Sequence, residues 1–213
     1  MKISNRLVKH AAIAASVAAA ASANAAIVYS GVVNFACAVD IDGCYINVET
    51  NTLSNGPGSG VPGWDVNPYS TSGGLNFFNS TGGGQMRTPG QTTGAAGNLA
   101  LGTVIGAAGS YNTLTSNVMT NATGGWQYGA NNIIGFRFVA ASGQTHYGWM
   151  RFAVGAIGSA GLGNNAPTRT VVDFAYESVA GGSIAAGDTG VIPAPGALAL
   201  LGVAGLAGAR RRR

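Results

Sequence analysis

The chain has 213 residues, of which 35 are glycine and 8% are charged, and its formal net charge is +4. Seven of its 11 lysines and arginines lie near the two ends, so the region between carries four arginines, no lysine and seven acids, a formal charge of −3. Such a region lacks the basic patch that binds phosphate backbones, which excludes nucleic-acid binding as its function.

The first 25 residues have the three parts of a secretory signal peptide. The positive n-region consists of Lys2, Arg6 and Lys9. Residues 11–21 form an alanine-rich apolar core, and residues 23–25 (Ala-Asn-Ala) match an A-x-A cleavage site. The alternative is a genuine N-terminal helix of the folded protein. We expect a signal peptide at 1–25 that is handled by a Sec-type export machinery and signal peptidase, and a mature chain that begins at Ala26.

Residues 26–188 are predicted to form one exported domain of about 160 residues. All 17 aromatic residues of the chain lie there, which is enough for a hydrophobic core. Long amphipathic helices need charged residues on their wet face, whereas Asn, Ser and Thr suit exposed strand faces and Gly suits turns. The composition therefore predicts an all-β body, an antiparallel β-sandwich of jelly-roll-like type, with a signal helix before it and a short transmembrane helix after it.

Alternating apolar residues locate the strands of this body. The predicted strands are 27–36, 44–50, 64–69, 75–79, 103–108, 132–141, 145–154 and 168–177. The clearest pair is joined by Ser142-Gly143 into a hairpin. One face of that hairpin is expected to carry Ile134, Phe136, Phe138, Met150, Phe152 and Val154, and the other Arg137, Tyr147, Trp149 and Arg151. In the last strand, Thr170, Val172, Phe174 and Tyr176 are expected to alternate with Arg169, Val171, Asp173 and Glu177.

The two cysteines of the chain flank a predicted turn near the start of the body. Cys37 and Cys44 stand on either side of Asp42-Gly43, a turn signal, in a chain expected to be exported. We therefore expect a disulfide that clamps the ends of a hairpin. Two thiols are too few for a structural zinc site, and Asp40-x-Asp42-Gly43 lacks the remaining ligands of a calcium loop. No metal or other cofactor is predicted.

Catalytic residue patterns are scarce in the body. His146 is the only histidine left after signal cleavage, and at the start of a strand a structural role is favoured over that of a base. Residues 161–166 match G-x-G-x-x-A, but an exported β domain gives this pattern no dinucleotide-binding context. Carboxylate-pair chemistry, as in a glycoside hydrolase, stays open through Asp40, Asp42, Asp65, Asp173 and Glu177. We expect a protein that is not an enzyme.

Aromatic residues near glycine-rich turns are candidates for binding sugars. Flat ring faces stack on pyranose rings, and Asn and Thr supply hydrogen bonds beside them. The candidates are Trp64, Trp126 and Trp149, together with Tyr69 and Tyr128. The alternative for each ring is a place in the core of the sandwich.

Residues 189–213 form a tail of three parts. Pro193-Ala194-Pro195 is extended and stops a helix, and residues 196–209 contain only Gly, Ala, Leu and Val. The chain ends in Arg210, Arg211, Arg212 and Arg213. A short apolar run followed by cations predicts a membrane segment with a cytoplasmic C-terminus. The alternative is a buried helix of a soluble domain, although the run has no polar face.

This order resembles the PEP-CTERM sorting signal of Gram-negative bacteria, a Pro-Glu-Pro-like motif followed by a short hydrophobic helix and a basic cluster. The chain departs from the family at Ala194, where the family has Glu. Phrases of the body such as GFRFV, GQTHYGWMRF and DFAYES also resemble a body that recurs in such proteins. The resemblance implies export, a membrane-anchored intermediate, and processing by a membrane sorting protease of exosortase type.

The expected function is therefore that of a non-enzymatic protein of the cell surface or of the extracellular matrix, associated with exopolysaccharide or biofilm. A carbohydrate-binding module is the first alternative and an exported glycoside hydrolase is the second. Exopolysaccharide is the expected partner of the body, and nucleic acid is excluded.

Overall fold

The fold is that of a computed structural model, which describes residues 26–71, 74–80, 83–88, 96–112, 116–117, 125–160 and 166–190. The signal helix expected at 1–25 and the membrane segment expected after residue 190 lie outside these residues. Within the described ranges, no helix is long and apolar enough to cross a membrane.

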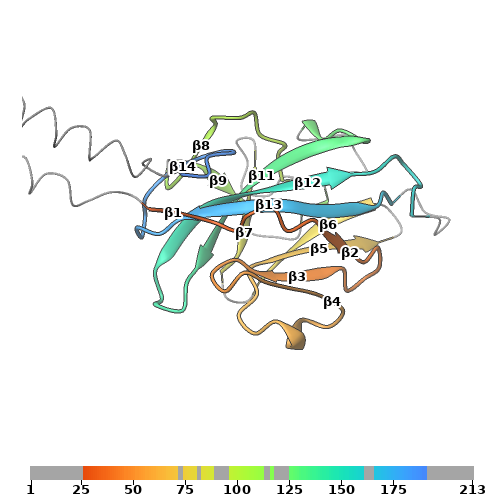
Figure 1. The fold of residues 1–213 in the computed structure, drawn as a ribbon, viewed down its shortest axis with the longest axis horizontal. Helices are drawn as coiled ribbons and strands as arrows, with labels where there is room; N and C mark the ends of the chain where they lie inside the picture. The colour runs from red at the N-terminus through yellow and green to blue at the C-terminus, as the bar shows by residue number, and fades with distance from the viewer. Residues whose placement is uncertain are drawn as a thin grey trace, which may run out of the picture.

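The strands form three antiparallel sheets, and they confirm the prediction of an all-β fold (Figure 1). The largest has the order β1 (Ile27–Tyr29), β13 (Arg169–Glu177), β12 (Thr145–Val154), β11 (Ala130–Val139), β7 (Gln85–Thr88) and β9 (Ser110–Tyr111), and β2 (Phe35–Cys37) also pairs with β13. The second has the order β10 (Ser116–Asn117), β6 (Gly74–Asn79), β5 (Val66–Thr71), β3 (Cys44–Asn47) and β4 (Thr52–Asn55). The third pairs β14 (Ile184–Ala185) with β8 (Val104–Ile105). Helical structure among the described residues consists of the 3₁₀ turn η1 (Gly58–Gly60) and the single 3₁₀ residue Gly125.

The two large sheets face each other across one hydrophobic core, so the body is a β-sandwich (Figure 1). The larger sheet contributes Ile134, Phe136, Phe138, Met150, Phe152, Val154, Val171 and Phe174, and the smaller one contributes Ile46, Val66, Leu75 and Phe77. The face predicted for the hairpin of β11 and β12 is therefore confirmed. Phe152 and Phe77 meet edge to face across the two sheets, with ring centroids 5.6 Å apart.

The opposite face of the larger sheet is covered too. A second cluster buries Tyr147 and Trp149 beneath Ile105 of β8 and Ile184 of β14. β14, which follows β13 in the chain, pairs with the earlier strand β8, and both short strands lie against β12. The side chains of a strand that is covered on both faces alternate between two apolar environments. Aromatic residues on the outer face of such a strand are therefore buried and not exposed to solvent.

The strand β13 contains a β-bulge that changes which residues face the core. The register of β12 and β13 shifts between Arg151 and Phe152, because Arg151 pairs with Asp173 whereas Phe152 pairs with Val171. Val172 is the extra residue, and its carbonyl accepts hydrogen bonds from the amides of Val33 and Asn34. The expected strict alternation is therefore wrong for β13, since Val171 and Phe174 both enter the core. The same contacts divide the strand expected at 27–36 into β1 and β2.

The disulfide between Cys37 and Cys44 is present, as predicted. Its setting differs from the expected hairpin clamp, because Cys37 ends β2 in the larger sheet and Cys44 begins β3 in the smaller one. The bond thus joins the two layers of the sandwich. The side chain of Asn55 in β4 supports the same junction, since it donates to Ala36 O and accepts from Ala38 N.

The long strands are consecutive in both the chain and the sheet. β11, β12 and β13 lie side by side in sequence order, and β5 and β6 form a hairpin in the other layer. In a jelly roll, successive strands alternate between the two sheets, so this part of the body is a meander rather than the expected jelly-roll-like arrangement. Short connections between neighbouring strands account for it.

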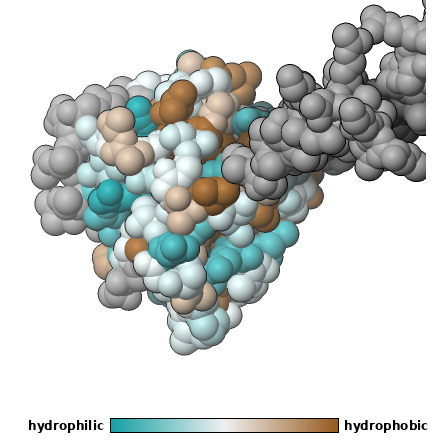
Figure 2. All heavy atoms as spheres, turned by 90° about the vertical axis from the view of Figure 1, so that its left-hand side faces the viewer, coloured by the Kyte–Doolittle hydropathy of each residue, from teal (hydrophilic) through white to brown (hydrophobic). Residues whose placement is uncertain are grey.

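Figure 2 views the sandwich from the side on which β1 is labelled in Figure 1. Hydrophobic side chains on this side lie in small separate patches between polar ones. Scattered patches of this kind are ordinary for a protein surface.

Candidate functional site

An aromatic groove lies on the outer face of the smaller sheet. It encloses about 310 Å³, and the residues that line it are Ile41, Tyr45, Trp64, Asn67, Tyr69 and Phe78. Four of the six are aromatic, which is the composition of surfaces that stack on flat apolar ligand faces.

Strand alternation places the rings of Tyr45 and Phe78 on the solvent side of the sheet. Tyr45 of β3 lies between Cys44 and Ile46, which are both buried in the core, so its side chain points outward. Phe78 of β6 follows the buried Phe77 and is 46% exposed. The rings of Tyr45 and Phe78 are thus each fixed by an inward neighbour that the core holds in place.

The four aromatic rings form a continuous row. Tyr45 meets Trp64 edge to face at 5.2 Å between centroids, Trp64 meets Phe78 at 6.3 Å, and Phe78 meets Tyr69 at 6.3 Å. The planes of neighbouring rings are inclined by 44–77°. The rings therefore make the walls of a groove rather than one flat platform.

A tightly bonded turn before β5 holds Trp64. The side-chain amide of Asn47 donates to the carbonyls of Pro62 and Gly63, at 3.0 and 3.1 Å. The next residue, Asp65, is buried, and its Oδ2 accepts from the Val48 amide at 3.0 Å. Burial raises the pKa of Asp65 from 3.8 to about 7, while the Val48 amide opposes this shift and Glu49 adds to it. The hydrogen bonds on both sides of Trp64 therefore fix its backbone and so the position of its indole ring.

The loop closed by the disulfide forms one wall of the groove and carries the exposed Ile41. The backbone carbonyl of Asp40 accepts from the Ser70 amide at 2.7 Å, and that of Asp42 accepts from the Asn67 side chain at 2.8 Å. Gly43 has a φ of +64°, and a Cβ there would lie 2.0 Å from the carbonyl oxygen of Pro68. The loop is thus docked against β5 so closely that glycine is required at this position.

The electrostatic surroundings of the groove are acidic. Burial raises the pKa of Tyr45, and the nearby carboxylate of Asp42 raises it further. The four arginines between residues 26 and 190 all belong to the larger sheet, at positions 87, 137, 151 and 169. Arg169 is buried and donates to Ser70 Oγ and Ala38 O, and its pKa is lowered to about 10 by desolvation. None of these cations lines the groove.

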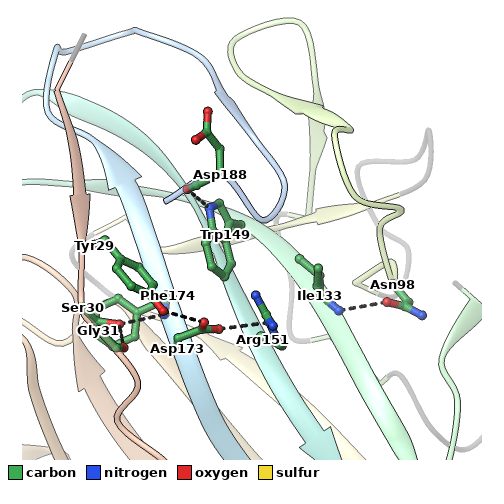
Figure 3. A network of polar contacts seen from close by, with 10 residues as sticks. All are labelled: Tyr29, Ser30, Gly31, Asn98, Ile133, Trp149, Arg151, Asp173, Phe174 and Asp188. Carbon is green, nitrogen blue, oxygen red and sulfur yellow. Dashed lines mark hydrogen bonds and ion pairs between the residues drawn. The ribbon is translucent and has the colours of Figure 1, made fainter. Parts of the chain in front are cut away.

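Two of the three tryptophans predicted to stack on sugars are buried instead. Trp126 lies in the main core, where its Nε1 donates to Ala96 O at 2.6 Å. Trp149 is fully buried under the returning chain, and its Nε1 donates to Asp188 O at 2.8 Å (Figure 3). For both residues the sugar-stacking prediction is corrected in favour of the core alternative, because segments that are distant in the sequence cover them. Trp64 lies in the groove together with Tyr69, whereas Tyr128 packs against the core.

An ion pair between neighbouring strands lies on the outer face of the larger sheet (Figure 3). Asp173 Oδ1 lies 3.1 Å from Arg151 Nε, and its Oδ2 accepts from the Tyr29 hydroxyl at 2.9 Å. The Tyr29 ring stacks against Trp149 at 6.3 Å. This network joins β1, β12 and β13, so its role is structural.

The remaining candidate catalytic groups are separately engaged. His146 is buried, with Nδ1 2.8 Å from Glu177 O and its ring stacked on Phe138. Glu177 is also buried, and its Oε1 accepts from the Val179 amide. Among the described residues, no group of three or more His, Cys, Asp or Glu side chains is arranged to hold a metal ion.

Sequence reasoning missed Tyr45, Phe78 and Ile41 as parts of the site. For Tyr45 and Phe78 the sequence did contain a signal, because each alternates with neighbours at core positions and so points outward. The place of Ile41 in the groove depends on how its loop docks, which the sequence does not show. Comparisons of the chain with family models, curated proteins and solved structures found no match.

Proposed function

We propose that this protein is an exported, non-catalytic protein of the cell surface or extracellular matrix whose body binds carbohydrate through the aromatic groove. The observation that carries the proposal is the row of Tyr45, Trp64, Phe78 and Tyr69 on an open sheet face. Aromatic rings with accessible apolar faces match the C–H faces of pyranose rings, and the amide and hydroxyl groups beside them match sugar hydroxyls.

Binding without turnover is proposed because the groove is lined by aromatic, aliphatic and amide side chains. Hydrolysis of a glycosidic bond requires two carboxyl groups on either side of that bond. Release of reducing ends from a polysaccharide, abolished by a single carboxylate substitution, would instead favour the glycoside hydrolase alternative.

Delivery is proposed to follow from the two ends of the chain. Residues 1–25 direct export through signal peptidase and a Sec-type machinery, and Pro193-Ala194-Pro195 with Arg210–Arg213 directs handling by an exosortase-like protease. The disulfide supports this setting, since such bonds persist in oxidising compartments. The proposed location is an inner-membrane intermediate and then the surface or matrix of a Gram-negative bacterium.

Replacing Arg210–Arg213 by serine is expected to weaken membrane retention, because each arginine costs about 2.5–3.5 kcal/mol at the bilayer centre. More precursor should then leave the cell uncleaved. The measurement is mass spectrometry of the C-terminal peptide of surface-released protein. Wild-type protein found outside the cell with Arg213 still attached would contradict a sorting function of the tail.

Replacing Trp64 by alanine is expected to weaken binding to a neutral polysaccharide about tenfold or more, as truncation of a central tryptophan typically does. The measurement is affinity electrophoresis of the full chain in a detergent without a sugar headgroup. Leu101→Ala is the control, since Leu101 is an exposed apolar residue of the segment that covers the larger sheet. Equal retardation of both variants and the wild type would place binding outside the groove.

A further inference from the structure

We infer that the groove selects glycans by charge, and that it favours a sugar with a free, protonated amino group over the same sugar with a hydroxyl or a carboxylate. The inference rests on the proposed carbohydrate-binding function and specifies its substrate class. It follows from the charged residues between 26 and 190, all of which lie in the described part of the chain.

An uncompensated acid stands at the rim of the groove. Asp42 is exposed, follows the lining residue Ile41, and is tied by its backbone carbonyl to the lining residue Asn67. Its carboxylate has no hydrogen bond or ion pair with the described residues, yet it lies near enough to the hydroxyl of Tyr45 to raise the pKa of that group. The carboxylate is therefore free to meet a cation on a bound ligand.

The neighbouring acid is engaged in a different way. Asp40 Oδ1 accepts from the Gly43 amide at 2.7 Å, and the carboxylate interacts electrostatically with the buried Arg169. Arg169 itself donates to Ser70 Oγ and Ala38 O inside the sandwich, so it does not neutralise Asp42. The net charge at the rim is thus negative.

Aromatic rings beside a carboxylate are the chemistry that recognises ammonium groups. Protonated amines are attracted to the faces of Trp and Tyr, and a carboxylate adds a charge-assisted hydrogen bond. A uronate, by contrast, would bring a second negative charge to a groove that has no cation among its lining residues. A ligand with amino groups therefore gains from both features, and an acidic ligand gains from neither.

The test uses four tetrasaccharides with the same β-1,4-linked gluco backbone, namely the glucosamine, N-acetylglucosamine, glucose and glucuronate tetramers. Affinities for the full chain in a zwitterionic detergent are measured by isothermal titration calorimetry at pH 6 and low salt. The glucosamine tetramer should bind about two- to fivefold more tightly than the glucose tetramer, as expected for one exposed charge pair. The glucuronate tetramer should bind most weakly.

Asp42→Asn should abolish the advantage of the amino sugar. Asp188→Asn is the matched control, because it changes the net charge equally but lies against the larger sheet, where Asp188 O accepts from Trp149. Added salt should reduce the preference in the wild type, since it screens exposed charges. These three results together would support selection by charge.

The outcomes separate this inference from the function on which it rests. Suppose that the tetramers bind and that Trp64→Ala weakens this binding. If glucuronate then binds as well as glucosamine, or if Asp42→Asn keeps the preference, selection by charge is wrong and the binding function stands. If no tetramer binds, or if Trp64→Ala binds them all as the wild type does, both proposals fail.

Discussion

Replacement of Phe152 by alanine is expected to lower the free energy of unfolding by about 3–5 kcal/mol. Phe152 is fully buried near the C-terminal end of β12, and its ring meets Phe77 of the facing sheet edge to face at 5.6 Å. Truncation removes this contact between the two layers and leaves a cavity that the surrounding strands, fixed by their hydrogen bonds, fill incompletely. Chemical denaturation followed by circular dichroism measures the loss.

Val139→Ala is the control for this substitution. Val139 ends β11 on the solvent side and is 40% exposed, so its truncation is expected to change stability by no more than about 0.5 kcal/mol. A loss below about 1 kcal/mol for Phe152→Ala would mean that the two sheets do not pack through this residue.

The second large effect is a dependence of stability on pH through Asp65. Its pKa is about 7 in the folded protein and 3.8 without burial, so between these values the folded state holds a proton that the unfolded state has released. The unfolded state then binds fewer protons, and stability falls as pH rises through this window. The expected loss is about 1.4 kcal/mol for each pH unit.

Asp65→Asn isolates this contribution, because the amide oxygen still accepts from the Val48 amide but does not titrate. The difference in unfolding free energy between wild type and variant should favour the wild type at pH 4 and move toward the variant by pH 7. Denaturant titrations at four pH values measure it. Parallel profiles for the two proteins would show that Asp65 is not desolvated in the folded state.

The sequence predicted the structure best where the alternation of apolar and polar side chains within a strand determines which face is buried. β11 and β12 were predicted with the correct inward set, because their side chains alternate and a Ser-Gly turn separates them. β13 was predicted as a strand with one unbroken alternation, which the bulge at Val172 interrupts. The bulge depends on backbone partners from the distant segment that contains Val33 and Asn34. No pattern in the sequence of β13 itself predicts a contact with that distant segment.

The aromatic character of the candidate site was predicted from the sequence, but only some of the residues that form it were. Trp64, Trp126 and Trp149 are chemically alike in the sequence. Two of them are nevertheless buried against segments distant in the chain, Trp126 at residue 96 and Trp149 at residue 188. Tyr45 and Phe78 join the groove through the pairing of β3, β5 and β6, which brings together residues 33 positions apart. Burial and assembly of this kind are tertiary properties that composition does not encode.

Under the proposed function, in which the tail anchors the protein and the groove binds a polysaccharide, the disulfide has a mechanical consequence. Tension on a ligand in the groove enters through the smaller sheet, whereas the described chain leads toward the tail from residues beside the larger sheet. Without the bond, parting layers would let the connection from residue 37 to 44 extend to about 25 Å. The bond holds the two Cα atoms 5.1 Å apart. This junction is therefore stiff and transmits the tension from one sheet to the other with almost no extension.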